Sequence, residues 1–152
     1  DVSVQLIIGG DGEEYSSLVK LVTDLELHEQ VKFLGKLNRN EVYEAVSSSN
    51  VYVLSSYVET FGVSLIEALS LGKPVIATQC GGPDTIVRKE DGILVQPGDI
   101  KALSTAMIEI KENYHRYDAE EIHEACIKRY GEKSIVEQLM NVYKEVLRSS
   151  GE

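Results

Sequence analysis

The sequence predicts an α/β fold in which an open parallel sheet carries helices on both faces. Short apolar runs alternate along the chain with stretches whose apolar residues recur at helical spacing. The runs are apolar at nearly every position, as strands are when helices cover both sides of a sheet. Alternation of such strands with helices is typical of a doubly wound, Rossmann-like sheet.

The apolar runs give the positions of the strands and of the helices between them. The expected strands span residues 4–8, 31–34, 51–54, 75–77 and 93–95. Helices are expected over 13–25, after a cap at Asn38 or Asn40, from the loop at 55–61 to Gly72, and from Pro83 onward. Asp99 can cap a helix over about 100–114, which is followed by helices over about 119–130 and 133–149. We therefore expect one domain over residues 1–152, with a helical C-terminal segment over about 99–149.

Composition narrows the function classes. Hydrophobic residues make up 43% of the chain and charged residues 26%, which excludes a disordered or fibrous protein. The formal net charge of −10 argues against a general nucleic-acid or anionic-membrane binder, because both need a basic face. We therefore expect no nucleic-acid partner.

The cysteines and the start of the chain indicate a cellular setting. Cys80 and Cys126 are too few for a disulfide framework or a zinc site, and we expect two reduced thiols in a cytoplasmic protein. No apolar run approaches the roughly 20 residues of a bilayer span, and no signal peptide is seen. The chain starts at Asp1, directly before a strand, which suggests a piece of a longer protein. Its histidines are scattered, so no metal site is expected.

Three loops are candidates for ligand binding, because ligands of open parallel sheets bind beyond the carboxyl ends of the strands. They span residues 9–12, 55–62 and 78–84. Glycines in the first loop permit close approach to a ligand, but Gly10-Asp11-Gly12 is followed by Glu13 and does not complete the dinucleotide fingerprint. A tight strand-to-helix turn and a ligand-contacting turn both stay open there.

The second loop leads into the most informative segment, residues 59–68. Free amide N–H groups near Gly62, at the start of a helix, form an anion site. Glu59 precedes that helix and Glu67 lies about one turn inside it, and ionised carboxylates accept hydrogen bonds from sugar hydroxyls. Structural roles compete with this interpretation. Ser64 and Glu67 have the spacing of a capping box, and Glu59 could be a solvated loop acid.

The third loop follows the fourth predicted strand. Gly81 and Gly82 again permit close approach, and Pro83 fits the first position (N1) of a short helix. The alternative is a strand-to-helix turn without a ligand. Cys80 is not expected to be a nucleophile, because no histidine lies near it in sequence.

The three loops together resemble one family. Residues 59–78, with the sequence E-T-F-G-V-S-L-I-E-A-L-S-L-G-K-P-V-I-A-T, resemble the E-x7-E region of retaining glycosyltransferases of the GT-B fold, family 4 (glycosyl transferases group 1). Residues 4–12 resemble the family's strand and G-D-G turn, and 31–35 its V-x-F-x-G strand. Residues 81–84 resemble its G-G-x-x-E loop, with Asp in place of Glu, and 92–99 its G-x-L-V-x-P-x-D stretch. The resemblance spans essentially the whole chain and corresponds to the family's C-terminal, donor-binding domain.

The resemblance implies roles for individual residues. Glu59 would contact the donor sugar as the catalytic residue, and Glu67 would contact the nucleotide ribose. Backbone groups around Gly62 would contact the donor's sugar or phosphate. The residues matched to donor-binding positions are Glu67, Phe61, Gly62, Val63, Gly10, Gly12 and Gly82.

An activity is implied as well. Members of the family transfer a sugar from a nucleotide sugar with retention of configuration and without a metal. This predicts a UDP- or GDP-linked donor, no cofactor, and a polysaccharide or glycolipid acceptor. Helix-end dipoles and basic side chains would stabilise the leaving diphosphate. The parent protein is expected in the cytoplasm or at the inner face of the membrane.

The chain departs from the family pattern in what it lacks. The family's domain normally begins with a further strand and helix, which bring an Arg and a Lys to the diphosphate, and an N-terminal domain binds the acceptor. Without these two charge-assisted contacts, at about 1.5–3 kcal/mol each, donor affinity should fall by roughly 10²–10⁴. We therefore expect this chain alone to be inactive. The missing strand would leave two strand edges unpaired, so the gap should close or be filled from another copy in a weak or swapped homo-oligomer.

Two other functions stay open at this point. A nucleotide-sugar epimerase on the same fold would also bind the donor, but would release an altered sugar. A non-catalytic, flavodoxin-like interaction module would bind no nucleotide.

Overall fold

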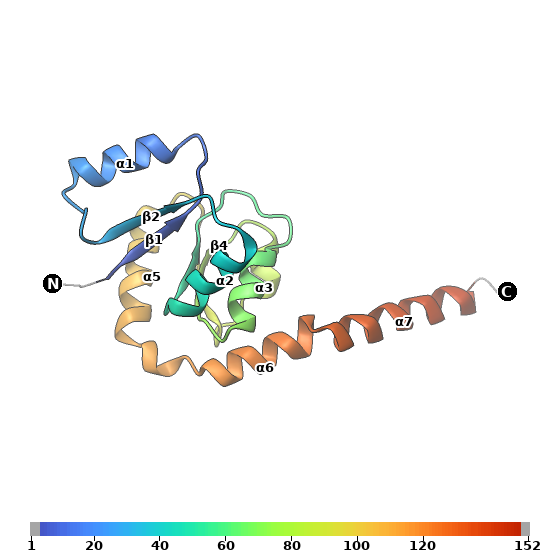
Figure 1. The fold of residues 1–152 in the computed structure, drawn as a ribbon. Helices are drawn as coiled ribbons and strands as arrows, with labels where there is room; N and C mark the ends of the chain where they lie inside the picture. The colour runs from blue at the N-terminus through green and yellow to red at the C-terminus, as the bar shows by residue number, and fades with distance from the viewer. Residues whose placement is uncertain (1–3, 150–152) are drawn as a thin grey trace. The chain divides into compact units, whose positions relative to one another are not determined.

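A computed structural model describes residues 4–149 (Figure 1). Its elements in chain order are β1 (Leu6–Gly9), α1 (Tyr15–Asp24), β2 (Val31–Gly35), α2 (Arg39–Ser48), β3 (Tyr52–Leu54), α3 (Val63–Ser70), β4 (Val75–Thr78), α4 (Gly82–Ile86), β5 (Gly92–Val95), α5 (Ile100–Glu112), a 3₁₀ turn (Tyr114–Arg116), α6 (Ala119–Tyr130) and α7 (Glu132–Ser149). Every strand expected from the sequence is confirmed. Within residues 4–149, no helix is both long and apolar enough to cross a bilayer.

The chain divides into two compact units, Asp1–Ser48 and Ser49–Glu152, each with its own parallel sheet. The α/β class with parallel strands is therefore confirmed. The strand order is β1-β2 in the first unit and β3-β4-β5 in the second, so β4 alone among the described strands has a neighbour on both sides. Whether the two units act as the single domain expected from the sequence stays a prediction.

The first unit holds β1, α1, β2 and α2. Tyr15 at the start of α1 packs edge-on against Phe33 of β2, with ring centroids 5.3 Å apart. Asn38 caps α2, because its Oδ1 accepts from the amide of Asn40 at 2.9 Å and the Glu41 carboxylate accepts from the amide of Asn38 at 2.7 Å. None of the described residues of this unit, 4–48, is buried. Its side chains therefore form no enclosed core within the unit.

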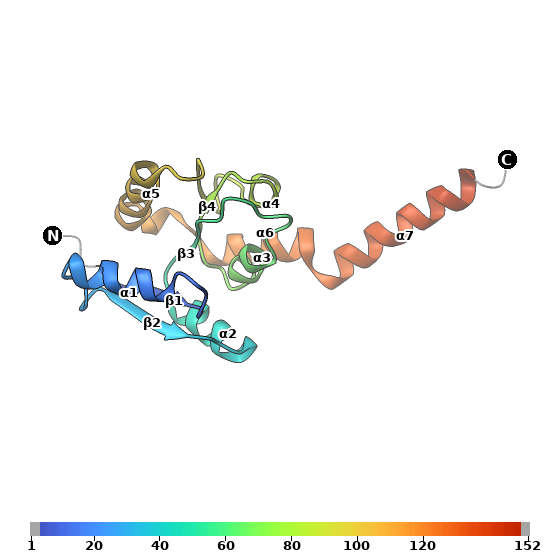
Figure 2. The same cartoon turned by 90° about the horizontal axis from the view of Figure 1, so that it is seen from above.

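The second unit contains the buried core. Ile76 of β4 pairs in register with Val53 of β3 and Ile93 of β5, and these side chains share one face of the sheet. On that face, Ala106 and Ile110 of α5 pack against Ile76. The opposite face is covered by α3, and Figure 2 shows α5 and α3 on the two sides of β3 and β4. Helices on both faces explain why these strands are apolar at nearly every position.

Helix α6 packs against α3 and completes this core. Ile122 and Cys126 of α6 are 1% exposed, as is typical of residues in a packed interior. The Cys126 thiol donates to the Ile66 carbonyl of α3 at 3.5 Å. Gly72 ends α3 with a φ of +68°, and a Cβ there would lie 2.5 Å from the carbonyl oxygen of Ala119. A glycine at this C′ position therefore allows both the left-handed turn and the close approach of α6.

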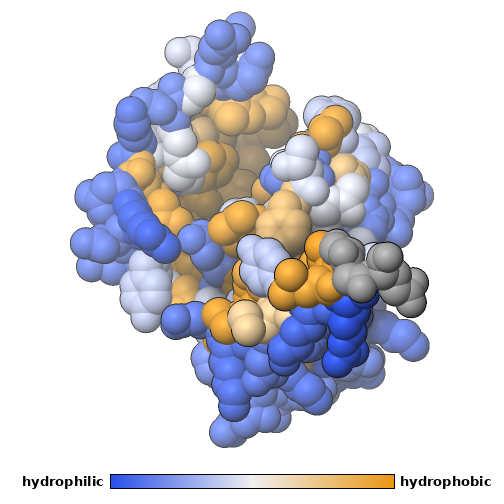
Figure 3. All heavy atoms as spheres, turned by 90° about the vertical axis from the view of Figure 1, so that its right-hand side faces the viewer, coloured by the Kyte–Doolittle hydropathy of each residue, from blue (hydrophilic) through white to orange (hydrophobic). Residues whose placement is uncertain are grey.

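Helix α7 carries its apolar stripe on the surface. Leu139, Val142 and Tyr143 are 51%, 54% and 62% exposed, so the helix is amphipathic without an apolar partner among the described residues. Figure 3 looks onto the C-terminal end of α7 and shows apolar side chains reaching the surface on that side.

Candidate functional site

Two of the three candidate loops are joined to each other in the second unit. They follow the carboxyl ends of β3 and β4, which are neighbouring strands. The Glu59 amide donates to the Cys80 carbonyl at 3.2 Å, and the Gly82 amide donates to the Glu59 carbonyl at 2.8 Å. The sheet thus continues as a single parallel bridge, Glu59 to Gly81, beyond the strand ends. This bridge brings Glu59, Phe61, Gly62 and Gly82 into one cluster.

The close approach of the two loops explains the paired glycines. A Cβ at Gly82 would lie 2.1 Å from the carbonyl oxygen of Phe61. A Cβ at Gly81 would lie 2.8 Å from the carbonyl oxygen of Glu59, and Gly81 also has a φ of +119°. Both positions therefore need glycine for the bridge itself.

The Glu59 carboxylate lies at the amino end of α3. Its Oε1 accepts from the amides of Gly62 at 3.1 Å and Phe61 at 3.3 Å, and the residue is half-buried. The idea that Glu59 is merely a solvated loop acid is therefore wrong. A carboxylate at a helix N-terminus is stabilised by the helix dipole.

The capping box considered for Ser64 and Glu67 is also wrong. Gly62, with a φ of +93°, is the N-cap residue of α3, and its carbonyl accepts from the amide of Leu65 at 3.0 Å. The helix therefore begins earlier than a box at Ser64 requires. The side-chain oxygen that accepts a hydrogen bond from the backbone at the start of α3 belongs to Glu59.

Glu67 stands one turn inside α3 with an exposed side chain. Phe61 and Val63, at the start of the helix, are 51% and 58% exposed. The amides of Val63 and Ser64 belong to the first turn, where an α-helix offers no internal acceptor. This helix end thus presents amide donors and a carboxylate to solvent.

The loop after β4 is held by its own short helix. Asp84 accepts from the Gly81 amide at 2.8 Å. Pro83 is buried and is the second residue of α4, not the first as expected, because the helix already begins at Gly82. The Thr78 hydroxyl lies 3.5 Å from the Cys80 sulfur and donates to the Ser56 carbonyl at 2.5 Å. Both cysteines are free thiols. A hydroxyl donor beside Cys80 is not a general base, so this contact does not activate the thiol.

A charged cluster behind α4 was not expected from the sequence. Asp91 is 0% exposed, and its carboxylate forms ion pairs with two guanidinium groups. Nη2 of Arg88 lies 2.5 Å from Oδ1, and Nη2 of Arg129 lies 3.1 Å from Oδ2. Arg88 donates side-chain hydrogen bonds to Asp91, and these bonds raise the pKa of the Arg88 guanidinium. The Arg88 guanidinium is therefore engaged by Asp91. A buried aspartate with an arginine 38 positions away leaves no local sequence pattern.

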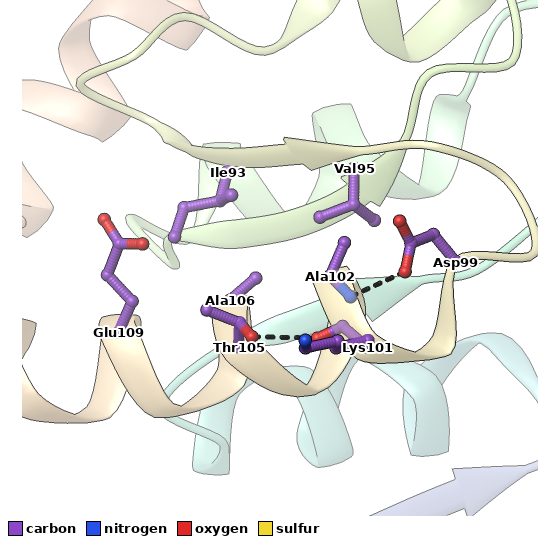
Figure 4. A pocket seen from close by; sticks show the side chains of 8 residues that line it. All are labelled: Ile93, Val95, Asp99, Lys101, Ala102, Thr105, Ala106 and Glu109. Carbon is purple, nitrogen blue, oxygen red and sulfur yellow. Dashed lines mark hydrogen bonds between the residues drawn. The ribbon is translucent and has the colours of Figure 1, made fainter.

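The second unit has two surface hollows, of which one is lined by residues of these loops. One, of about 340 Å³, lies between β5 and α5 and includes Asp99, whose Oδ1 caps α5 by accepting from the Ala102 amide (Figure 4). Another, of about 240 Å³, lies at the carboxyl ends of β3 to β5 and includes Ser55 and Tyr57. Neither of these two hollows is lined by Glu59 or Glu67.

Gly10 and Gly12 belong to the first unit. Gly10 has a φ of +137° and its amide donates to the Gly35 carbonyl at 2.7 Å, so it is the residue that the turn requires. A Cβ would meet nothing within 4 Å at either glycine. Within residues 4–149, no group of three or more His, Cys, Asp or Glu side chains is arranged to hold a metal ion.

A parallel α/β architecture with glycine loops beyond its strand ends is typical of ligand-binding domains. The sequence profile of the family described as "Glycosyl transferases group 1" matches residues 1–133, and the chain belongs to this family.

Individual relatives agree with this assignment. The chain is 33% identical to the N-acetyl-alpha-D-glucosaminyl L-malate synthase of Bacillus anthracis, over 97% of this chain and 39% of that protein. Anabaena Alr3699/HepE in complex with UDP superposes with a TM-score of 0.83 and 26% identity, over 93% of this chain and 41% of that one. A sucrose-phosphate synthase of Thermosynechococcus elongatus gives 0.79 and 28%, over 97% and 39%. The chain therefore spans about two fifths of these relatives, and the GT-B fold assignment is confirmed.

Proposed function

We propose that this chain is the donor-binding part of a retaining glycosyltransferase that uses a UDP- or GDP-linked sugar. The observation that supports it best is the amino end of α3, where the Glu59 carboxylate and the first-turn amides of the helix lie together. Anabaena Alr3699/HepE, which matches 93% of this chain with 41% of its own length, has been solved with UDP and with UDP-glucose.

The proposed chemistry follows from which atoms are already occupied. Oε1 of Glu59 accepts from the amides of Phe61 and Gly62, so those two amides are satisfied without a ligand. The second carboxylate oxygen can accept from a hydroxyl of the donor sugar. The amides of Val63 and Ser64 are free to receive a phosphate oxygen, which the dipole of α3 also favours.

The remaining roles rest on the family resemblance. Glu67, exposed one turn into α3, would accept from the ribose hydroxyls. Gly82 lets the third loop lie close to Phe61 of the second loop, while Gly10 and Gly12 are proposed as donor-binding residues of the first unit. In the transfer step, helix-end amides would stabilise the leaving diphosphate as its charge develops.

The activity itself is proposed for a longer parent protein. We propose that the parent transfers a hexose to a polysaccharide or glycolipid acceptor without a metal, and that this chain alone is not a competent catalyst. The two free thiols support a cytoplasmic location. Self-association through the edge strands β1 and β3 is a further prediction, which size-exclusion chromatography with light scattering tests.

Saturation-transfer NMR tests the proposal, because it detects weak binding. UDP, GDP and their glucose and mannose esters would be titrated separately into the chain. We expect saturation of the ribose and base protons for one nucleotide series, loss of that signal in Glu67→Gln, and no loss in the control Glu137→Gln on α7. No saturation from any nucleotide, or unchanged saturation in Glu67→Gln, would contradict the proposal.

A further inference from the structure

We propose that Arg129, near the C-terminal end of α6, is a positioning residue for the donor-binding loops. This inference rests on the proposed function, because it identifies what holds that site in shape. Arg129 acts through Ile86 and Tyr130 and is not expected to touch the donor.

The guanidinium of Arg129 joins α6 to the end of α4. Its Nη1 donates to the Ile86 carbonyl at 2.8 Å, and its Nε donates to the Ala125 carbonyl of its own helix at 3.2 Å. Ile86 is the last residue of α4, which has only five residues. A helix this short is not stable by itself, so an external donor to its last carbonyl contributes directly to its order.

Asp91 fixes where this guanidinium lies. Its carboxylate is fully buried and is paired with both Arg88 and Arg129. A buried charge without partners is costly, so the Asp91 carboxylate holds both guanidinium groups beside it. Arg88 reaches Asp91 from three residues away, whereas Arg129 comes from 38 positions away. Of these two, only Arg129 ties separate elements together.

A second path runs through Tyr130. The Arg129 guanidinium lies 5.1 Å from the centroid of the Tyr130 ring, and that ring packs edge-on against Phe61 with centroids 6.4 Å apart. Phe61 in turn gives its amide to Glu59. Arg129 is thus bonded to Ile86 at the end of α4, and Tyr130 packs against Phe61 in the loop at residues 59–62. The last two residues of α6 are therefore connected to both donor loops.

Amide hydrogen exchange without ligand gives the first test. Arg129→Met is compared with Arg88→Met, because each variant removes one guanidinium from Asp91 but only the first also loses the bond to Ile86. The amides of Gly62 and Gly82, both bonded to Glu59, report the two loops. We expect exchange at both amides at least tenfold faster in Arg129→Met than in Arg88→Met. Equal exchange in the two variants would overturn the proposal.

UDP affinity gives the second test. We expect Arg129→Met to bind UDP about tenfold more weakly than the unmodified chain, equivalent to about 1.4 kcal/mol, and Arg88→Met to stay within about twofold. Arg129→Lys, which keeps the charge but not the planar fork, should fall between them. An affinity of Arg129→Met equal to that of Arg88→Met would contradict the proposal.

A milder pair covers the case in which Arg129→Met does not fold. Tyr130→Phe keeps the ring against Phe61 and should keep both exchange and affinity, while Tyr130→Leu should weaken UDP binding severalfold. Equal behaviour of this pair would count against the proposal. The outcomes also separate the two claims: an unmodified chain that binds no nucleotide contradicts the proposed function, whereas normal binding with unchanged variants contradicts only the role of Arg129.

Discussion

Glu59 is bonded to Gly62, the N-cap residue of the helix that follows it, by a side-chain oxygen 3.1 Å from the glycine amide. The same oxygen accepts from Phe61. One carboxylate oxygen therefore shapes the loop, which leaves the other for a ligand. This division means that structural and binding effects at Glu59 can be separated by the choice of substitution.

Replacing Glu59 by Ala should destabilise the second unit by about 1 kcal/mol, the usual cost of losing a cap. Replacing it by Gln should cost less than about 0.5 kcal/mol, because the amide oxygen can still accept from Gly62. Both variants should lose binding of the donor sugar, since Gln replaces one acceptor by a donor. Urea unfolding measures the first effect and titration with UDP-glucose the second. A Gln variant as unstable as the Ala variant would refute the capping role.

Gly82→Ala should destabilise the paired loops by about 1–3 kcal/mol, as overpacking does. The added Cβ would lie 2.1 Å from a backbone oxygen of Phe61, which cannot rotate away. Gly12→Ala is the matched control, because a Cβ there meets nothing within 4 Å, and it should cost less than about 0.5 kcal/mol. Equal midpoints of urea unfolding for the two variants would contradict the tight approach of the loops.

The free energy of unfolding should decrease at alkaline pH because of the Cys126 thiol. Burial raises the pKa of its thiol above the ordinary value of 9.0, so the unfolded chain releases this proton first. The stabilisation is complete below pH 9 and is lost as the pH rises from there, by at most about 1.4 kcal/mol per pH unit. Burial also raises the pKa of Tyr117, which adds to the decline only above pH 10.

Unfolding free energies measured at pH 8, 9 and 10 check this expectation. Cys126→Ala should flatten the decline, whereas Cys80→Ala leaves the buried thiol in place and the decline should persist. An unchanged slope in Cys126→Ala would show that another group causes it.

The two C-terminal helices should respond differently to substitution. Ile122→Ala on α6 should cost about 2–4 kcal/mol, because the side chain is 1% exposed against α3. Leu139→Gln on α7 should cost less than about 1 kcal/mol, because that side chain is 51% exposed. Urea unfolding compares them. A large cost for Leu139→Gln would indicate that the stripe of α7 is covered in solution by another copy, and light scattering would detect that copy.

Much of the fold was predictable because it depends on local rules. Uniformly apolar runs such as 75–77 predicted β4, and Asp99 and Gly72 marked a helix start and a helix end where the structure has them. These features depend on a few neighbouring residues, and the sequence displays those residues directly.

The arrangement of the site was less predictable, because it depends on contacts between distant residues. The spacing of Ser64 and Glu67 favoured a capping box, but Gly62 can adopt a positive φ and starts the helix two residues earlier. Asp91, between an acid and a glycine, looks like a surface residue until Arg129 is brought to it by the packing of α6 on α3. Such pairs could be recognised only once the helices were placed.

A crystal structure of this chain soaked with UDP would show whether the amino end of α3 binds the nucleotide. We expect ribose hydroxyls within hydrogen-bond distance of the Glu67 carboxylate and a phosphate oxygen at the amides of Val63 and Ser64. UDP bound elsewhere on the chain, with Glu67 free in solvent, would contradict this expectation.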